Sequence, residues 1–309
     1  MAGLTDNGLT INSLQDQIAQ LKAKAQTIFA DLVPAGDTVN TSDNTVIGRQ
    51  IGLVAPSLAD LWEAIQQVND SFNILSATGI ALDNLCALGG ITRKKPASSV
   101  VSLLVTGTPG TLIPVLSQVG SPTTSKNFNL LESVTIDATS CAMVKIDVPT
   151  VADATVYTLQ FIKVPDTLSQ GTFTISITSG TGATKNSILT ALKAAIDSSY
   201  STLFSTVIGA DGYLQVTMLD VFQKVTFSSS ANLSFVKAMK MTSAACTETG
   251  PIQAAPNTVT VIKTPVLGWD SVYNPASAVL GQDLETDEAL RLRYLTTKGV
   301  DGVNSFEAI

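Results

Sequence analysis

The stretch VTGTPGTLIP, Val105 to Pro114, decides what kind of fold follows the first third of this chain. Its glycines and threonines are also typical of a phosphate-binding loop, but such a loop needs a lysine and a helix N-terminus directly after the glycines. No lysine follows Gly110 here, and the next residues are again apolar in the manner of a strand. Pro109 presets φ for the first central position of a turn, and Gly110 supplies the positive φ of the second. The stretch therefore predicts a β-hairpin and not a nucleotide site.

The composition excludes most catalytic chemistry and argues against nucleic acid as a ligand. The chain has no histidine, which removes Ser-His-Asp and Cys-His catalysis, HExxH zinc sites and most proton shuttles. A net charge of −7 and a pI of about 4.6 oppose phosphate binding, which needs clustered lysine and arginine. The one basic cluster, Arg93-Lys94-Lys95, is predicted to be a solvated loop. We find no set of catalytic, cofactor-binding or metal-binding residues, and we expect the chain not to be an enzyme.

Two further polar features are assigned structural roles. The acidic run Asp283, Glu285, Asp287 and Glu288 lacks the alternating oxygens, the central glycine and the final glutamate of a calcium loop. It is predicted to be the solvated start of a helix. A lone tryptophan, Trp269, follows a glycine and is predicted to cover the edge of a β domain.

The chain is apolar for a protein in which we expect no membrane span. Hydrophobic residues make up 45% and charged residues 14%, yet no apolar run approaches the roughly 20 residues that cross a bilayer. We therefore expect part of the surface to be hidden against protein partners. Cys86, Cys141 and Cys246 lie far apart among apolar or small neighbours, which predicts buried free thiols in a reducing compartment.

Two heptad seams occupy the N-terminal region. Apolar residues recur at alternating steps of three and four from Ile11 to Leu32 and again from Ile47 to Leu75, which predicts two helices with apolar stripes. Pro56 lies within the second seam and predicts a kink or a break near Ala55. A short helix over Leu82 to Leu88 closes this region.

The stripes of the two helices can be covered in two ways. The helices can form an antiparallel hairpin in which each fills the other's seam, or part of the apolar face can meet helices of another subunit. Each buried Leu or Ile contributes about 1.5–3 kcal/mol, so a seam left in water is costly, and two helices cover only part of such stripes. We keep both hypotheses and favour a bundle with partner helices. The candidate interface residues are Ile11, Leu14, Ile18, Leu21, Ile28, Leu32, Ile47, Ile51, Leu58, Leu61, Ile65, Val68 and Phe72.

The pattern changes to β after Pro96. Runs rich in Val, Leu and Thr follow, with period-two alternation around Val134 and Ile136. Between residues 148 and 246, strands flank a helix with the sequence KNSILTALKAAIDSSY, and Asp211-Gly212 marks a hairpin. Because β texture returns afterwards, we interpret this segment as an insertion into a β domain.

These segments predict an α+β, multidomain fold. The N-terminal helical, bundle-forming region spans 1–95. A discontinuous β-rich core domain spans 96–147 plus 247–281, and the inserted small α+β domain spans 148–246. The start of a C-terminal helical or α+β region spans 282–309.

The C-terminal segment predicts a helix that Thr286 caps and that ends at Lys298-Gly299. Asn304, with Glu307 three residues later, predicts a capping box that begins another helix. Because the chain stops a few residues into that helix, we expect the native protein to continue into a further α/β region.

Two blocks of the sequence contain a series of glycine, proline, tryptophan and charged residues in a characteristic order. The first block, Gly79 to Ser121, contains Gly79, Leu82, Asp83, Gly90, Ile91, Arg93, Gly107, Gly110, Ile113 and Pro114. The second contains Gly268-Trp269-Asp270-Ser271-Val272, Asn274-Pro275, Gly281, Glu285-Thr286-Asp287, Arg291 and Arg293. This order resembles the baseplate J-like family of contractile-tailed phages, and with the helices it covers the larger part of the chain. The chain departs from the family at Leu116, where a glycine is common, and in the 148–246 insert, which is similar to small α+β domains of tail sheath proteins.

The resemblance implies a structural role without cofactors. Proteins of this kind are subunits of the baseplate wedge, assembled around the tail hub, and they help couple host contact to sheath contraction. The implied partners are other copies of the chain, other baseplate wedge proteins, and sheath-initiating or hub proteins. The implied location is the tail baseplate of the virion, with the host cytoplasm as the place of assembly.

Two other classes of function stay open. A receptor-binding tail adhesin or spike component fits the Ser/Thr-rich β texture, although aromatic residues make up only 6% and no repeat is visible. A tail-associated hydrolase would need a cleft with paired carboxylates, and no such pair stands out.

Overall fold

The computed structural model describes residues 3–5, 8–164 and 172–306. The chain forms two compact units, one of Met1–Lys94 with Glu285–Ile309 and the other of Lys95–Leu284. The fold is mixed α+β with a β-rich core, as the sequence predicts. Among the described residues, no helix combines the length and the apolar character needed to cross a membrane.

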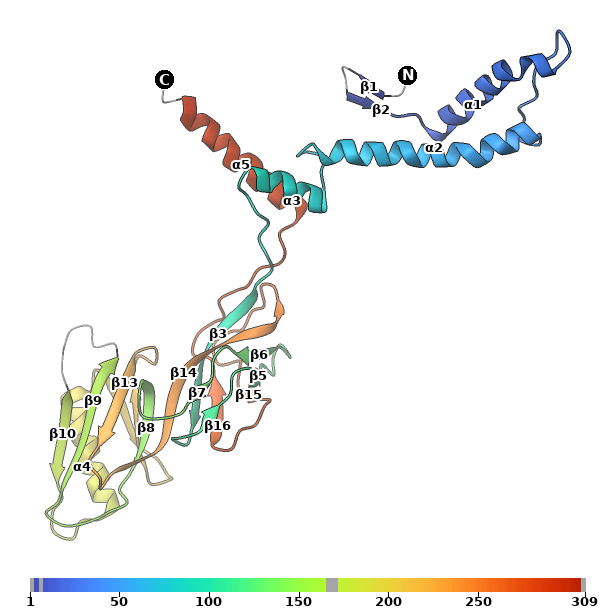
Figure 1. Ribbon diagram of the computed structural model, residues 1–309. Helices are drawn as coiled ribbons and strands as arrows, with labels where there is room; N and C mark the ends of the chain where they lie inside the picture. Colours follow the sequence, from blue (N-terminus) through green and yellow to red (C-terminus); the bar gives the residue numbers. More distant parts are fainter. Residues whose placement is uncertain (1–2, 6–7, 165–171, 307–309) are drawn as a thin grey trace. The chain divides into compact units, whose positions relative to one another are not determined.

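The first unit is mainly helical. Its elements are β1 (Gly3–Thr5), β2 (Gly8–Thr10), α1 (Leu14–Ile28), the 3-10 helix η1 (Ala30–Leu32), α2 (Val46–Ser71), α3 (Gly79–Leu88) and α5 (Asp287–Phe306) (Figure 1). Side-chain caps determine where the helices begin. Ser13 and Asp16 form a capping box at the start of α1, and the Thr45 hydroxyl accepts a hydrogen bond from the Gly48 N–H at the start of α2.

Helix α2 runs unbroken across Pro56, so the predicted break near Ala55 is wrong. Proline in a helix removes one backbone hydrogen bond and crowds the carbonyl four residues earlier. Here that carbonyl belongs to Gly52, and Pro56 lies on the exposed side of the helix. Ala55 is fully buried, so packing holds the helix together where local propensity would end it.

Helix α5 is one continuous helix from Asp287 to Phe306. The predicted N-cap is confirmed, since the Thr286 hydroxyl accepts a hydrogen bond from the Ala289 N–H at 3.2 Å. The predicted end at Lys298-Gly299 and the new helix start at Asn304 are wrong. A glycine in a helix interior costs only about 1 kcal/mol, which neighbouring helical residues can offset. Glu307, the second half of the predicted capping box, lies outside the described residues.

The second unit is built on one large antiparallel sheet with the helix α4 (Lys185–Tyr200). Its strands are β3 (Ser98–Gly107), β4 (Leu112–Ile113), β5 (Gln118–Gly120), β6 (Asn127–Leu130), β7 (Val134–Thr135), β8 (Cys141–Asp147), β9 (Val156–Val164), β10 (Phe173–Thr178), β11 (Phe204–Ile208), β12 (Leu214–Met218), β13 (Lys224–Ser229), β14 (Ser234–Thr249), β15 (Val261–Ile262) and β16 (Trp269–Tyr273). The predicted hairpin at Asp211-Gly212 is confirmed, because it joins β11 to β12 in antiparallel register.

The long strand β14 ties this sheet together. Its first part pairs with β8, and β3 pairs with it from Ala238 onward. Strands that the sequence assigns to the β-rich core and to the insert therefore share one sheet (Figure 1). The boundaries drawn between these two domains stay a prediction.

The turn at Pro109-Gly110 is confirmed, but the hairpin is wrong. The Thr111 N–H donates to the Thr108 carbonyl at 3.1 Å, and Gly110 has a φ of 92°. The strands on either side of the turn do not pair with each other. Both edges of β3 are occupied, by β14 and β16, so the chain after the turn forms β4 and pairs with β7 instead.

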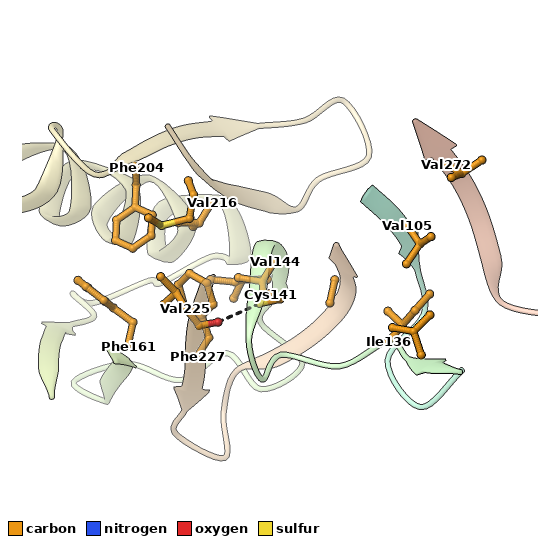
Figure 2. Close-up of a cluster of buried hydrophobic side chains, with 14 of the residues drawn as sticks. Val105, Ile136, Cys141, Val144, Phe161, Phe204, Val216, Val225, Phe227 and Val272 are labelled. Carbon is orange, nitrogen blue, oxygen red and sulfur yellow. Dashed lines mark hydrogen bonds between the residues drawn. The ribbon is translucent and has the colours of Figure 1, made fainter. Parts of the chain in front are cut away.

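The core of this unit combines aliphatic and aromatic side chains (Figure 2). Phe161 stacks on Phe173 with ring centroids 5.0 Å apart and meets Phe204 edge-on at 4.8 Å. Such pairs add to the free energy gained from burial alone.

The predictions for the cysteines and for Trp269 are confirmed in their structural part. Cys86, Cys141 and Cys246 are buried free thiols, and burial raises the pKa of Cys141 to about 12. Figure 2 shows the Cys141 thiol donating to the Val225 carbonyl. Trp269 is buried on the edge strand β16, and its indole N–H donates to the Ser271 carbonyl at 3.0 Å.

Candidate functional site

Helix α1 packs along the N-terminal part of α2, so each helix fills part of the other's seam (Figure 1). The buried apolar side chains are Ala25 on α1 and Ile51 and Ala55 on α2. An ion pair between Lys22 and Asp43, 2.9 Å long, adds a contact at the solvent-exposed side. The antiparallel hairpin considered from the sequence is therefore present.

The remaining apolar face of α2 is uncovered within the described residues. Leu61 is 57%, Val68 59% and Phe72 77% exposed, and the spacing of seven and four residues places them on one stripe. A single exposed leucine is ordinary on a protein surface, but a continuous apolar stripe marks an interaction site. We call Val54, Leu61, Ile65, Val68 and Phe72 the α2 stripe.

An open groove between the two helices continues this stripe. Leu21 and Ile28 line the groove from α1, and Ile47 and Val54 line it from α2. Its volume is about 270 Å³, and its lining is mainly apolar. A groove of this kind between two helices fits the apolar face of a third helix.

The structure separates the predicted interface residues by exposure. Ile51 is buried, Ile11, Ile18, Leu21, Ile47 and Leu58 are half-buried, and Leu14, Ile28, Leu32, Leu61, Ile65, Val68 and Phe72 are exposed. Of these residues, Leu21, Ile28, Ile47 and Ile51 line the groove between α1 and α2. A partner interface at these positions stays a prediction.

The charged side chains of α2 avoid the seam. With Ile51 at position a and Val54 at position d, the flanking e and g residues from Gln50 to Ser71 are uncharged. The charged residues Arg49, Asp60, Glu63 and Asp70 occupy the outer c and f positions. A partner helix can therefore dock its apolar side on this face whether its own flanking residues are positive or negative, because no charge at the flanking positions of α2 would repel them. The face itself carries no acidic or basic side chain.

A second cluster of interest joins α3 to α5, which lie side by side (Figure 1). The Arg93 guanidinium donates to Asp83 at 2.7 Å, to Asp287 at 2.6 Å and to the backbone carbonyl of Glu285 at 2.6 Å. Asp287 also accepts from the Gly79 N–H at 2.9 Å, at the N-terminus of α3, where the helix dipole favours a carboxylate. The Gly79 hydrogen bond, followed by Arg93, holds the pKa of Asp287 below its usual range.

Glu285 and Arg293 form the other half of this cluster. Arg293 holds the Glu285 carboxylate in a fork, with N–O distances of 2.8 and 2.7 Å, and the Lys94 N–H donates to the same carboxylate at 2.9 Å. The Glu285 side chain is only 8% exposed. These contacts, with Arg293 the largest cause, lower the pKa of Glu285 to about 2.

A third arginine fixes the segment between α2 and α3. Arg291 donates to the carbonyl of Ile74 at 2.9 Å and to the carbonyl of Ala77 at 2.8 Å. We call the six charged side chains the arginine clamp; they are Arg93, Arg291, Arg293, Asp83, Glu285 and Asp287. All six belong to the two sequence blocks quoted above, so the clamp gives those residues a common structural role.

The clamp corrects two predictions. The segment Arg93-Lys94-Lys95 is a loop in which Lys94 and Lys95 are exposed, as predicted, but the Arg93 side chain is largely withdrawn from water. Glu285 and Asp287 are likewise not solvated at the start of α5. The physical reason is that packing of α5 on α3 brings opposite charges together, and spacing along the sequence does not report such a contact. Asp283 and Glu288 are exposed, as predicted. The signal that could have revealed the clamp is the presence of arginines and carboxylates in both blocks.

The described residues offer no place for a bound metal. No group of three or more Cys, Asp or Glu side chains among them lies close enough together to hold an ion. Each carboxylate of the clamp is hydrogen-bonded to a protein donor. The cluster is therefore arranged to hold helices together.

Comparisons with known proteins give weak likenesses among solved structures only. No family model matches the chain, and no curated protein matches it significantly. Among solved structures, a chain of the anti-feeding prophage (AFP) baseplate, determined by cryo-EM with 6-fold symmetry, is similar with a TM-score of 0.30 and 15% identity. The likeness covers 92% of this chain and 59% of the AFP baseplate chain, so this chain spans less than two thirds of the length of the AFP baseplate chain. A TM-score this low carries no argument about function.

Proposed function

We propose that this chain is a non-enzymatic structural subunit of a contractile-tail baseplate. In its finer form, the proposal makes the chain a wedge component that assembles around the tail hub and helps couple host contact to sheath contraction. Its partners are other copies of itself or other wedge proteins, with sheath-initiating or hub proteins as further neighbours. It binds no nucleic acid, and it resides in the tail particle after assembly in the host cytoplasm.

The observation that carries the proposal is the exposed α2 stripe. Large apolar side chains at heptad spacing, 57% exposed at Leu61 and 59% at Val68, are unfavourable in water. Their spacing matches what a helical bundle buries. A subunit that completes a helical bundle with other chains would bury the α2 stripe, whereas a monomeric protein would leave these apolar side chains exposed to water.

Two further observations support the proposal. Six of the residues on which the family resemblance rests meet in the arginine clamp, although Arg93 and Asp287 are 194 positions apart in the sequence. The flanks of the α2 stripe are uncharged, which suits permanent association better than transient recognition of charged ligands.

The test uses substitutions that the isolated chain should tolerate. Leu61→Asp with Val68→Asp places two charges on the stripe at exposed positions, so the fold of the chain should not change. Gln66→Asp with Gln67→Asp adds the same charge to α2 away from the stripe and serves as the matched control. Both variants are introduced into cells that produce the tail particles, and assembled particles are counted by electron microscopy.

We expect the stripe variant to abolish assembled baseplates and the control to leave their number unchanged. A normal yield of particles that contain the stripe variant would rule out a partner-filled bundle. Loss of particles in both variants would show that charge on α2 in general, and not the stripe, is responsible, and it would also count against the proposal.

A further inference from the structure

Helix α5 is held against α3 by a small apolar cluster. Leu290 is the α5 side chain that is fully buried there, and Tyr294 packs against the cluster while partly exposed. Their neighbours are Leu82 and Cys86 of α3 together with Ile91. Since stability follows the apolar area removed from water, this cluster alone holds α5 weakly.

The arginine clamp supplies the other contacts that fix α5. Asp287 and Arg291 lie in its first turns, and through them α5 reaches Arg93, Gly79 and the carbonyls of Ile74 and Ala77. When these contacts break together, Leu290 and Tyr294 still provide apolar contacts between α5 and the cluster on α3.

The energetics of such a clamp differ from those of an apolar core. When α5 docks, the charged side chains of the clamp lose hydration, which costs free energy, and gain attraction to opposite charges, which offsets that cost. The net free energy of docking through the clamp is therefore small. Removing one member leaves its direct partner without the opposite charge and tips the balance towards release. Salt weakens the clamp chiefly at its more exposed side chains, Asp83 (41%) and Arg293 (30%), because the screening length falls to about 3 Å at about 1 M ionic strength and more buried charges are screened less.

We propose that the arginine clamp is a releasable latch, through which α5 detaches from α3 as one cooperative segment while α2 and the β-rich unit stay folded. The latch stands apart from the assembly proposal, because it concerns α5 and not the α2 stripe. Local opening of this kind occurs where apolar contacts are few. In this chain that description fits the α3–α5 contact better than it fits the core around Phe161.

Hydrogen exchange of the full chain, followed by mass spectrometry, tests the latch. In the wild-type protein, amides of α5 up to Lys298 should exchange at least about tenfold faster at about 1 M salt than at about 0.01 M, because screening weakens the clamp. Amides of α2 and α4 should keep their rates. Equal protection of α5 at both salt concentrations would overturn the latch, and so would a simultaneous loss of protection in α2.

Two variants sharpen the result. Arg93→Gln should accelerate exchange of α5 at low salt to the rate that the wild type shows at high salt. Lys126→Gln is the matched control, since it removes one positive charge from an ion pair with Glu248 in the β-rich unit and should leave α5 unchanged. If Arg93→Gln fails to fold, the wild-type salt series still decides between a latch and a fixed contact. Unchanged α5 exchange in a folded Arg93→Gln protein would contradict the inference.

Discussion

Arg93 and Asp287 are 194 positions apart in the sequence, and their guanidinium and carboxylate groups lie 2.6 Å apart in the fold. The two side chains are 14% and 26% exposed, so the pair is largely withdrawn from water. Charge-assisted hydrogen bonds are about twice as strong as neutral ones. The contact fixes the start of α5 beside α3.

A double-mutant cycle measures this pair directly. Arg93→Gln and Asp287→Asn should each destabilise the helical unit, and the double variant should lose less than the sum of the two. The expected interaction free energy is about 1–3 kcal/mol, because contacting members of one network couple by about this amount. Urea denaturation followed by circular dichroism provides the four free energies. Additive losses would show that the two side chains act independently.

Glu285 predicts an acid-dependent loss of stability. Its pKa is about 2 in the folded chain against an ordinary value of 4.5. Because the folded value is lower, the stabilisation is complete above about pH 4.5 and disappears as the pH falls towards 2. The free energy of unfolding of wild type and Glu285→Gln should therefore converge over this window. A constant difference between the two proteins across the window would show that Glu285 does not titrate in this way.

Gly281 lies at a place where no side chain fits. A Cβ atom there would stand 2.1 Å from the Ala97 carbonyl oxygen and 2.6 Å from that of Gly250. Gly281→Ala should therefore destabilise the β-rich unit by about 3 kcal/mol, as expected for overpacking against backbone that cannot move aside. Gly52→Ala is the control, because a Cβ atom there meets nothing within 4 Å and alanine favours the helix by roughly 0.5–1 kcal/mol. The thermal transitions of both variants check the contrast, and equal midpoints would refute it.

Leu116 adopts a backbone conformation that disfavours it. Its φ is 65°, and its N–H donates to the Leu130 carbonyl at 3.0 Å. The left-handed conformation costs a leucine about 1–2 kcal/mol, and glycine does not have this cost. Glycine also gives the unfolded chain more conformational entropy, which offsets part of that gain. Leu116→Gly should therefore stabilise the β-rich unit by up to about 1 kcal/mol. A lower melting temperature for this variant would mean that the exposed leucine contributes packing that outweighs the strain.

Periodicity and turn chemistry predicted most of the elements. The seams from Ile11 and Ile47, the helix at Lys185–Tyr200 and the turn at Gly110 follow from local spacing, which the sequence reports directly. Local rules failed at Pro56, where burial of Ala55 overrides a helix breaker.

The sequence did not allow us to predict which strands pair with each other or which charged side chains form ion pairs. The hairpin at Pro109-Gly110 failed because β3 already has a neighbour on each edge, which is a property of the whole sheet. The clamp was missed because Arg93 and Glu285 meet through the packing of α5 on α3. The exposure of Leu61 and Val68 likewise became visible only once α1 was placed on α2. The spacing of apolar residues predicts which side of a helix is apolar, and the tertiary packing determines whether that side is buried or exposed.

The most direct test of the central proposal is the position of this chain in a tail particle. Gold-labelled antibody against the chain is applied to intact and contracted particles and viewed by negative-stain microscopy. A baseplate subunit predicts label in a ring at the distal end of the sheath in both states. Label at fibre tips, or no label on the particle, would contradict the proposal.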